Sequence, residues 1–323
     1  MTRQYSRREL LRLTLGLGGL ALSGCGGGGG GGDAGGDDGG NPGGGNGGGS
    51  GGISGYKALV CVFLNGGNDG YNMLVPTTAE MYARYSRARL NLAIPQDQLL
   101  PLRGLAPDGA SYGLHPSCVE LQNLFDSGSA ALVSNVGSLL HPTTRNDFLN
   151  GNGIPSRLFS HNHQQEQWQT ARPDIITATG WAGRISDLLP EVNGDGILPL
   201  NVSIAGSNLL QAALRRQAFV LTSGGASSLA IGEKTALRKA YDAIQALERS
   251  DPYESQFAGT HRNALEISAA LRSRLSSTAL ATPFPEDNEL AEQLRMVARL
   301  VQSRAALGMK RQIFFVSIGG WDN

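Results

Sequence analysis

The chain has 323 residues, 46 of them glycine, and its 27 Lys and Arg residues balance its 27 Asp and Glu residues. This length suffices for one large domain or two ordinary domains. Because the formal net charge is zero, the chain has no global field that would favour nucleic acid or an acidic partner, and we expect no nucleic-acid partner.

Residues 1–25 are predicted to be an export signal. Arg3, Arg7 and Arg8 precede an apolar run over residues 10–22, which is too short to indicate a membrane-spanning helix. The stretch SRRELLR resembles the twin-arginine export signature, with leucine where phenylalanine is usual. A general secretory signal that contains two arginines by coincidence is the alternative.

The stretch LSGC at residues 22–25 resembles a lipobox, in which the cysteine carries lipid after cleavage. A coincidental cysteine after small residues is the alternative. Acyl chains on Cys25 would hold the mature protein on a membrane, in the periplasm or at the cell surface. Residues 26–55 are almost wholly glycine and have no side chains to bury, so they are predicted to be a disordered, flexible linker.

Residues 56–323 are predicted to form one α/β domain. Tyr56–Leu64 is a short continuous apolar run, typical of a strand that is covered on both faces of a parallel sheet. Ala130–Val136 indicates a second such strand, which follows a predicted helix over Pro116–Phe125. Cys61 and Cys118 are interpreted as two separate buried thiols, although export would also permit a disulfide.

The second half of this domain alternates predicted helices and strands. Asn201–Ile204 indicates a short strand, and the helices predicted at residues 229–247 and 254–275 form a helical insertion around residues 225–280. Apolar residues recur at helical spacing within Glu286–Leu307, and the strand Ile313–Ile318 follows after a short turn. A helix, a turn and a buried strand are the second half of a βαβ unit.

Two of the predicted strands end in the same way. Gly-Gly-x-Asp follows the first strand and ends in Asp69, and the same pattern follows the last strand and ends in Asp322. Ligands of open α/β sheets bind outside the carboxyl ends of strands, and converging carboxylates suit divalent cations. We therefore expect the two aspartates to share a metal site. Ordinary turn chemistry, in which the Asp side chain bonds to backbone, is the alternative.

Five stretches in order resemble one bacterial family of exported proteins. They are VFLNGGNDGYNMLVP (62–76), GLHP (113–116), LFSHNHQQEQWQ (158–169), GWAGR (180–184) and RQIFFVSIGGWDN (311–323). Together they resemble the family catalogued as domain of unknown function 1501, which is grouped with the alkaline phosphatase and sulfatase superfamily. The resemblance covers most of residues 56–323.

This resemblance implies a doubly wound α/β fold, with a mainly parallel sheet flanked by helices, and a metal-dependent hydrolase site. Asp69 matches an aspartate that binds metal after the first strand in the superfamily, and Asp322 matches a second one after a later strand. The family usually reads Gly-Gly-aromatic-Asp-x-His there, so its histidine would fall beyond Asn323. Two later segments of the family are also absent, and we expect the chain to be incomplete at its C-terminus.

The resemblance also implies a nucleophile near a helix start after the second conserved strand. Thr143 and Thr144 are the candidates, and Arg145 could hold an anionic phosphate or sulfate through paired hydrogen bonds. The alternative is that either threonine caps the helix. His161 is a candidate metal ligand, and its alternative role is to bond loop backbone.

Two functions follow from these expectations. The first is a lipid-anchored hydrolase of phosphate or sulfate esters that uses a divalent ion such as zinc, calcium or magnesium. The second is a non-catalytic protein of the cell envelope that keeps the fold and binds a partner or a surface polysaccharide, since fold alone does not establish activity.

Overall fold

The computed structural model describes residues 55–107, 109–134, 136–226, 235–275 and 279–321. The chain divides into two compact units, residues 1–55 and 56–323. The predicted signal, Cys25 and all but the last residue of the predicted linker lie outside the described residues.

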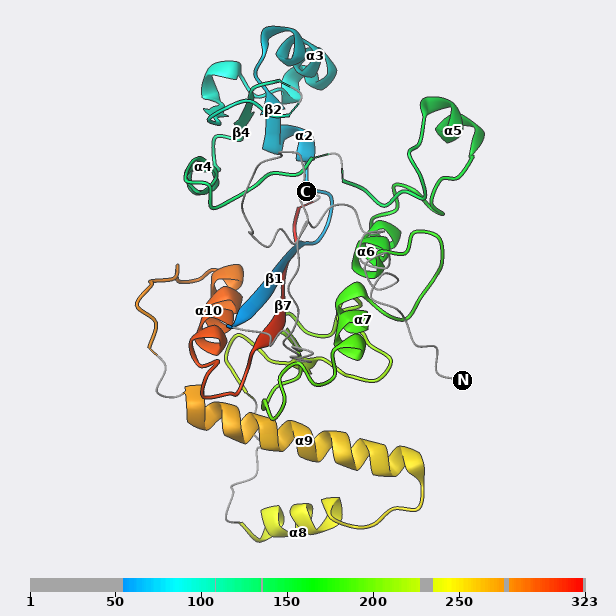
Figure 1. Cartoon of the computed structure of the whole chain (residues 1–323), viewed down its shortest axis with the longest axis vertical. Helices are drawn as coiled ribbons and strands as arrows, with labels where there is room; N and C mark the ends of the chain where they lie inside the picture. The colour runs from blue at the N-terminus through cyan, green and yellow to red at the C-terminus, as the bar shows by residue number, and fades with distance from the viewer. Residues whose placement is uncertain (1–54, 108, 135, 227–234, 276–278, 322–323) are drawn as a thin grey trace, which may run out of the picture. The chain divides into compact units, whose positions relative to one another are not determined.

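The main sheet has four strands in the order β1-β7-β5-β6, and each of its pairings is parallel. Its strands are β1 (Lys57–Leu64), β7 (Arg311–Ile318), β5 (Asn201–Ser203) and β6 (Phe219–Val220). The prediction of a mainly parallel sheet is confirmed. The first and last strands of the unit lie side by side, although their sequences are far apart (Figure 1).

Helices cover both faces of this sheet, and the alternation of β7 side chains assigns each residue to one face. Phe314 and Val316 pack in one core cluster with residues of α10 (Glu289–Gln302). Ile313 and Phe315 pack in another cluster, which includes Ala182 of α7 (Trp181–Leu188). Figure 1 shows α10 and α7 on opposite sides of β1 and β7.

A side chain of α10 completes the hydrogen bonding of β7 where β5 has ended. The backbone N–H of Ser317 donates to Oε1 of Gln293 at 3.0 Å, and Nε2 of Gln293 donates to the carbonyl of Ser317 at 2.9 Å. Gln293 is buried, and its amide bonds the backbone N–H and C=O of Ser317, which would otherwise need a neighbouring strand. It fixes the carboxyl end of β7, from which the Gly319-Gly320 turn leaves.

The strand β1 differs from the prediction in its burial. It lies at the edge of the sheet, and Lys57–Val60 are exposed, whereas Gln312–Val316 of β7 are buried. An edge strand has a neighbour on one side only, so its apolar sequence does not guarantee cover. Cys61 and Cys118 are both free and only partly buried, so they are separate as predicted but not fully buried.

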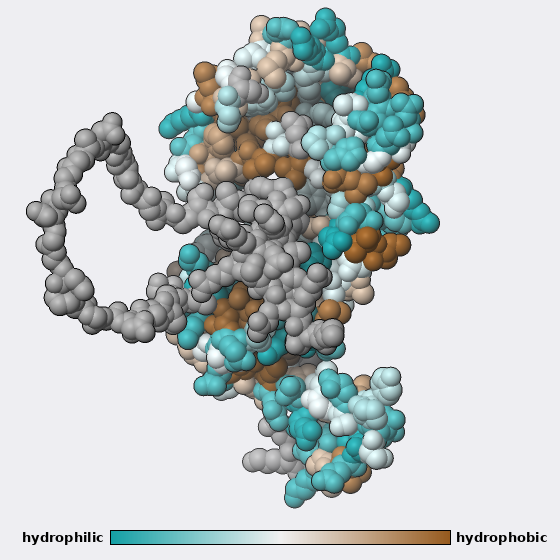
Figure 2. Space-filling view, turned by 45° about the vertical axis from the view of Figure 1, so that its right-hand side comes forward, coloured by the Kyte–Doolittle hydropathy of each residue, from teal (hydrophilic) through white to brown (hydrophobic). Residues whose placement is uncertain are grey.

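The predicted strand Ala130–Val136 is wrong for the residues that the structure describes there, because residues 130–134 and 136 form no strand. Val133 is 70% exposed and Val136 is also exposed. A short apolar run fits a buried strand, but it specifies no partner that could accept its backbone hydrogen bonds. Figure 2 shows apolar patches among hydrophilic ones on the visible face of the molecule.

A second, antiparallel sheet was not predicted. It has the strand order β2-β4-β3, with β2 (Leu74–Pro76), β4 (Tyr112–Leu114) and β3 (Leu100–Pro101). Its small core contains Val75, Tyr85 and Leu99. The helices and turns around it are α2 (Gly70–Met73), α3 (Ala79–Arg89), η1 (Leu90–Leu92), η2 (Gln96–Gln98) and α4 (Val119–Asp126).

The remaining described helices lie in the loop region after α4 and in the predicted insertion. They are α5 (Arg145–Asn150), α6 (His161–Thr170), α8 (Ala236–Gln245) and α9 (Pro252–Leu275). The helical insertion is thus confirmed for its described residues, and Leu271 and Leu275 of α9 join the core beneath α10. Among the described residues, no helix combines the length and the apolar character that crossing a membrane requires.

Candidate functional site

The two Gly-Gly segments both follow the carboxyl ends of their strands, at the same end of the main sheet. Strands β1 and β7 pair in parallel from Lys57 and Arg311 to Leu64 and Ile318, so both chains leave the sheet at one level. The backbone N–H of Asn65 donates to the carbonyl of Ile318 at 2.8 Å and continues the ladder beyond the strands.

The glycines of these segments take conformations that other residues rarely adopt. Gly66 has φ 113° and Gly320 has φ 85°, both in the region that favours glycine. The side-chain amide of Asn65 also donates a hydrogen bond to the Ser317 hydroxyl, which links the turn after β1 to the carboxyl end of β7. Asp322 lies outside the described residues, so its distance from Asp69 stays a prediction.

The carboxylate of Asp69 pairs with the guanidinium of Arg89, the last residue of α3. The Asp69 side chain is 45% exposed, and such a surface pair contributes about 0–1 kcal/mol. The following residues of this loop are also tied to α3, because the Tyr85 hydroxyl donates to Oδ1 of Asn72 at 2.6 Å. A metal ion at Asp69 would have to displace Arg89.

Thr143 and Thr144 both use their hydroxyl groups in local backbone structure. The Thr143 hydroxyl donates to the carbonyl of His141 at 2.9 Å. Thr144 forms a capping box with Asp147 at the start of α5, which holds the pKa of the Asp147 carboxyl below its ordinary value. Arg145 is the exposed first residue of that helix. The nucleophile and anion-binding roles of these residues stay predictions.

His161 is the exposed first residue of α6. On a helix, His161 and His163 point about 200° apart, so they cannot chelate one ion as they could from a strand. Within the described part of the chain, no three His, Cys, Asp or Glu side chains gather closely enough to share a metal ion. The predicted ligand set of Asp69, His161 and Asp322 therefore depends on Asp322.

Two side-chain contacts that the sequence reasoning missed lie at the start of α6. Oγ of Ser160 is 2.9 Å from Nδ1 of His163, and Nη1 of Arg157 is 2.7 Å from Nε2 of the same ring. A guanidinium can only donate, so Nε2 accepts and Nδ1 carries the proton that is donated to Ser160. His163 is thereby arranged to stabilise negative charge on the Ser160 oxygen.

Backbone strain precedes these contacts. Arg157 has φ 56° and Phe159 has φ 71°, positive values that cost roughly 1–3 kcal/mol each in residues other than glycine. Ser160 then occupies the N-cap position of α6 without using its side chain to cap the helix. The sequence signal for the contact between Ser160 and His163 was their spacing of three residues, which brings side chains together on a helix. It was not recognised because no helix had been predicted at α6.

Comparison of the chain with family models, with curated proteins and with solved structures finds no match in any of the three.

Proposed function

We propose that the chain is an exported, lipid-anchored, metal-dependent hydrolase of phosphate or sulfate esters, with the alkaline phosphatase-like fold of the 1501 family. The observation that supports this proposal is the parallel pairing of β1 with β7. Because these neighbouring strands end in register, Asp69 and Asp322 each follow a strand at the same edge of the sheet. This is the edge at which open α/β sheets bind ligands.

The residues that would hold a divalent ion are Asp69, Asp322 and His161. The described residues supply only Asp69 and His161, and Asp69 is neutralised by Arg89. Two carboxylates that converge need a cation between them, and a metal ion can take the place of the guanidinium. When bound, such an ion would polarise the ester and balance its negative charge.

The hydroxyl group best placed to attack an ester is that of Ser160. Thr143 and Thr144 already serve a turn and a helix cap, whereas the Ser160 oxygen receives a hydrogen bond from His163. The N-terminus of α6 adds a partial positive charge near this oxygen. Both features would stabilise negative charge that develops on this oxygen, and the hydroxyl proton would leave to a base other than His163, because Nδ1 of His163 already carries a proton.

The test measures hydrolysis and metal content in the same preparations. The full chain is assayed with p-nitrophenyl phosphate and p-nitrophenyl sulfate, and its zinc, calcium and magnesium are measured by elemental analysis. We expect Asp69→Asn and Asp322→Asn each to lower both quantities, and Ser160→Ala to lower hydrolysis alone. Asp97→Asn is the matched control, because Asp97 is exposed in η2. A full chain with neither metal nor activity contradicts the proposal.

The second candidate is a non-catalytic envelope protein that binds a partner or a polysaccharide. The Asp69–Arg89 ion pair and the Thr144 capping box favour it, because both give candidate site residues a purely structural use. Unchanged metal content in Asp69→Asn, together with a loss of stability, would support this reading.

A further inference from the structure

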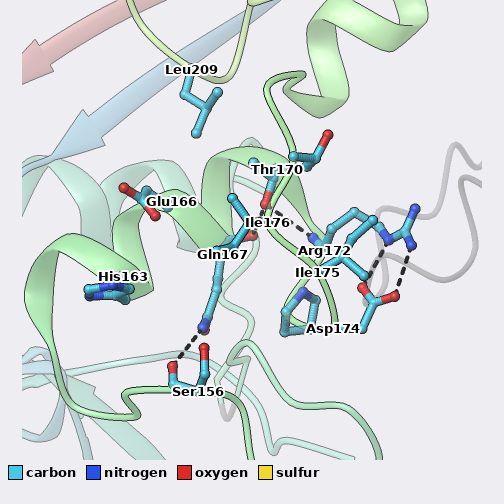
Figure 3. Close-up of a pocket in the computed structure, with 12 residues that line it drawn as sticks. Ser156, His163, Glu166, Gln167, Thr170, Arg172, Asp174, Ile175, Ile176 and Leu209 are labelled. Atoms are coloured by element: carbon cyan, nitrogen blue, oxygen red, sulfur yellow. Dashed lines mark hydrogen bonds and ion pairs between the residues drawn. The ribbon is translucent and has the colours of Figure 1, made fainter.

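Two pockets formed by described residues differ in how their charges are balanced. The first has a volume of about 210 Å³ and lies beside α6, where Arg172 donates two hydrogen bonds to Asp174, at 2.9 and 2.8 Å (Figure 3). The second has a volume of about 330 Å³ and lies between α10 and the segment that precedes this helix. Its described lining contains two arginines and no carboxylate, so its positive charge is not balanced from within.

The two arginines of the second pocket lie one turn apart on α10. Arg295 and Arg299 are four residues apart, a spacing that brings side chains to one face of a helix. The other side of the pocket is formed by three side chains of the preceding segment, Leu280, Thr282 and Phe284. Gln302 of α10 holds the start of this segment, because its Nε2 donates to the carbonyl of Ala279 at 3.0 Å. Figure 1 shows the segment beside α10.

The guanidinium of Arg299 is fixed in place but meets no carboxylate. Its Nη2 donates to the carbonyl of Leu275, the last residue of α9, at 2.6 Å. Its Nε is buried without a partner, whereas Nη1 also has no partner in the described part of the chain and is accessible. Arg299 therefore caps the end of α9 and keeps one N–H group that a ligand can reach.

Arg295 is exposed and forms no ion pair within the described ranges. The acidic residue one turn before it is Glu292, whose carboxylate accepts a hydrogen bond from the Ser223 hydroxyl at 3.2 Å. Two like charges four residues apart on a helix destabilise it. An anion that bridges Arg295 and Arg299 would remove this repulsion.

The charge and the shape of the pocket indicate the class of ligand. Two guanidinium groups match a doubly charged head group, and guanidinium binds phosphate oxygens through paired hydrogen bonds. The Thr282 hydroxyl can donate a further hydrogen bond to such a head group. The volume lies in the range of small-molecule sites and leaves room for an organic group against Leu280 and Phe284.

We infer that this pocket binds an amphipathic organic dianion, with a phosphate-type head group on Arg295 and Arg299 and an apolar group against Leu280 and Phe284. None of these residues belongs to the proposed hydrolase site. Gln293 of α10 contacts the carboxyl end of β7, and Arg299 lies six residues further along the helix, about 9 Å towards the other end of the strand. The inference goes beyond the proposed function, because binding here requires neither a metal ion nor hydrolysis.

The test is calorimetry with phenylphosphonate on the full chain, at low ionic strength and in the presence of EDTA. The probe has a carbon–phosphorus bond in place of an ester, so the proposed hydrolase activity does not consume it. We expect saturable binding that persists in EDTA, which separates this pocket from the proposed metal site. Inorganic phosphate lacks the apolar group and benzenesulfonate carries one charge, so each should bind several-fold more weakly.

Three arginine variants locate the binding site. Arg295→Gln changes an exposed side chain, so the protein should fold, and it should weaken phenylphosphonate binding about three- to tenfold. Arg299→Gln should weaken binding about tenfold or more, and circular dichroism checks that α9 stays folded without its cap. Arg262→Gln is the matched control, because Arg262 is an exposed arginine of α9 outside the pocket lining, and it should bind as the parent chain does.

Four outcomes would overturn the inference. They are no saturable binding of phenylphosphonate, binding that is lost in EDTA, binding of inorganic phosphate or benzenesulfonate as tight as that of phenylphosphonate, and a folded Arg295→Gln that binds as the parent chain does. A chain that binds phenylphosphonate in EDTA but has neither metal nor hydrolase activity would contradict the proposed function and support this inference.

Discussion

The strands β1 and β7 have similar apolar sequences and end in the same Gly-Gly-x-Asp pattern, yet they are buried very differently. They are direct neighbours, paired over their whole length. Phe314 and Val316 of β7 are fully buried, whereas Leu59, Val60 and Val62 of β1 are exposed. The difference shows that the number of neighbours around a strand, and not its own composition, decides how deeply its side chains are buried.

The largest expected effect of this difference is at Phe314, which is 0% exposed in the cluster beneath α10. Phe314→Ala should lower the free energy of unfolding by about 3–5 kcal/mol, because it removes buried surface and leaves a cavity. Chemical denaturation followed by circular dichroism measures this change. A loss below about 1 kcal/mol would mean that the β7 core is not packed as described.

A matched pair of valines sharpens the comparison. Val316 of β7 and Val62 of β1 pair in register, but Val316 is 0% exposed and Val62 is 43% exposed. Val316→Ala should cost about 2–3 kcal/mol, and Val62→Ala should cost under about 1 kcal/mol. Because residue type, strand position and substitution are the same, the difference measures burial alone. Equal losses in denaturant unfolding would contradict the exposure of β1.

The next effect concerns how the carboxyl end of β7 is held. Gln293→Met removes the amide that bonds the backbone N–H and C=O of Ser317. Leaving these groups unpaired should cost about 1–3 kcal/mol, and hydrogen exchange at Ser317 should become faster. Gln302→Met, at the exposed end of the same helix, removes only a solvent-exposed hydrogen bond to the carbonyl of Ala279, so it is the control and should change stability by under about 1 kcal/mol. Unchanged exchange at Ser317 would show that Gln293 does not hold this strand.

Local sequence patterns predicted the helix α10 and the strand β7. The helical spacing of apolar residues in α10 and the short turn before β7 are sequence-local, and both elements were placed to within a few residues. The placement of β1 and β7 in one mainly parallel sheet was predicted from apolar strands separated by helical segments, whereas their direct pairing was not predicted. For Ala130–Val136 the same apolar signal was misleading, because it carries no information on a partner strand.

The candidate site was less predictable because its contacts link residues that no local pattern connects. Arg89 reaches Asp69 from the end of a helix in the second sheet's region, and neither that helix nor that sheet was predicted. The contact between Ser160 and His163 is local, but it becomes visible only once α6 is known to be a helix. Side-chain pairing in the site therefore depended on elements that the sequence reasoning had not assigned.

The variant Arg89→Gln is expected to have the smallest effect on stability, and it tests whether the two glycine turns form a metal site. Arg89→Gln removes the guanidinium from Asp69, and a partly exposed ion pair contributes only about 0–1 kcal/mol. Metal binding should become stronger in this variant, because the guanidinium and a divalent ion compete for the Asp69 carboxylate. Elemental analysis after dialysis against zinc, calcium or magnesium should therefore show higher metal occupancy in Arg89→Gln than in the parent chain.

Arg84→Gln is the control variant. It breaks the exposed Arg84–Glu80 pair on the same helix and should leave metal content unchanged. If Arg89→Gln binds no more metal than this control, Asp69 is held by its ion pair as a structural residue, and the envelope-binding function gains support over the hydrolase.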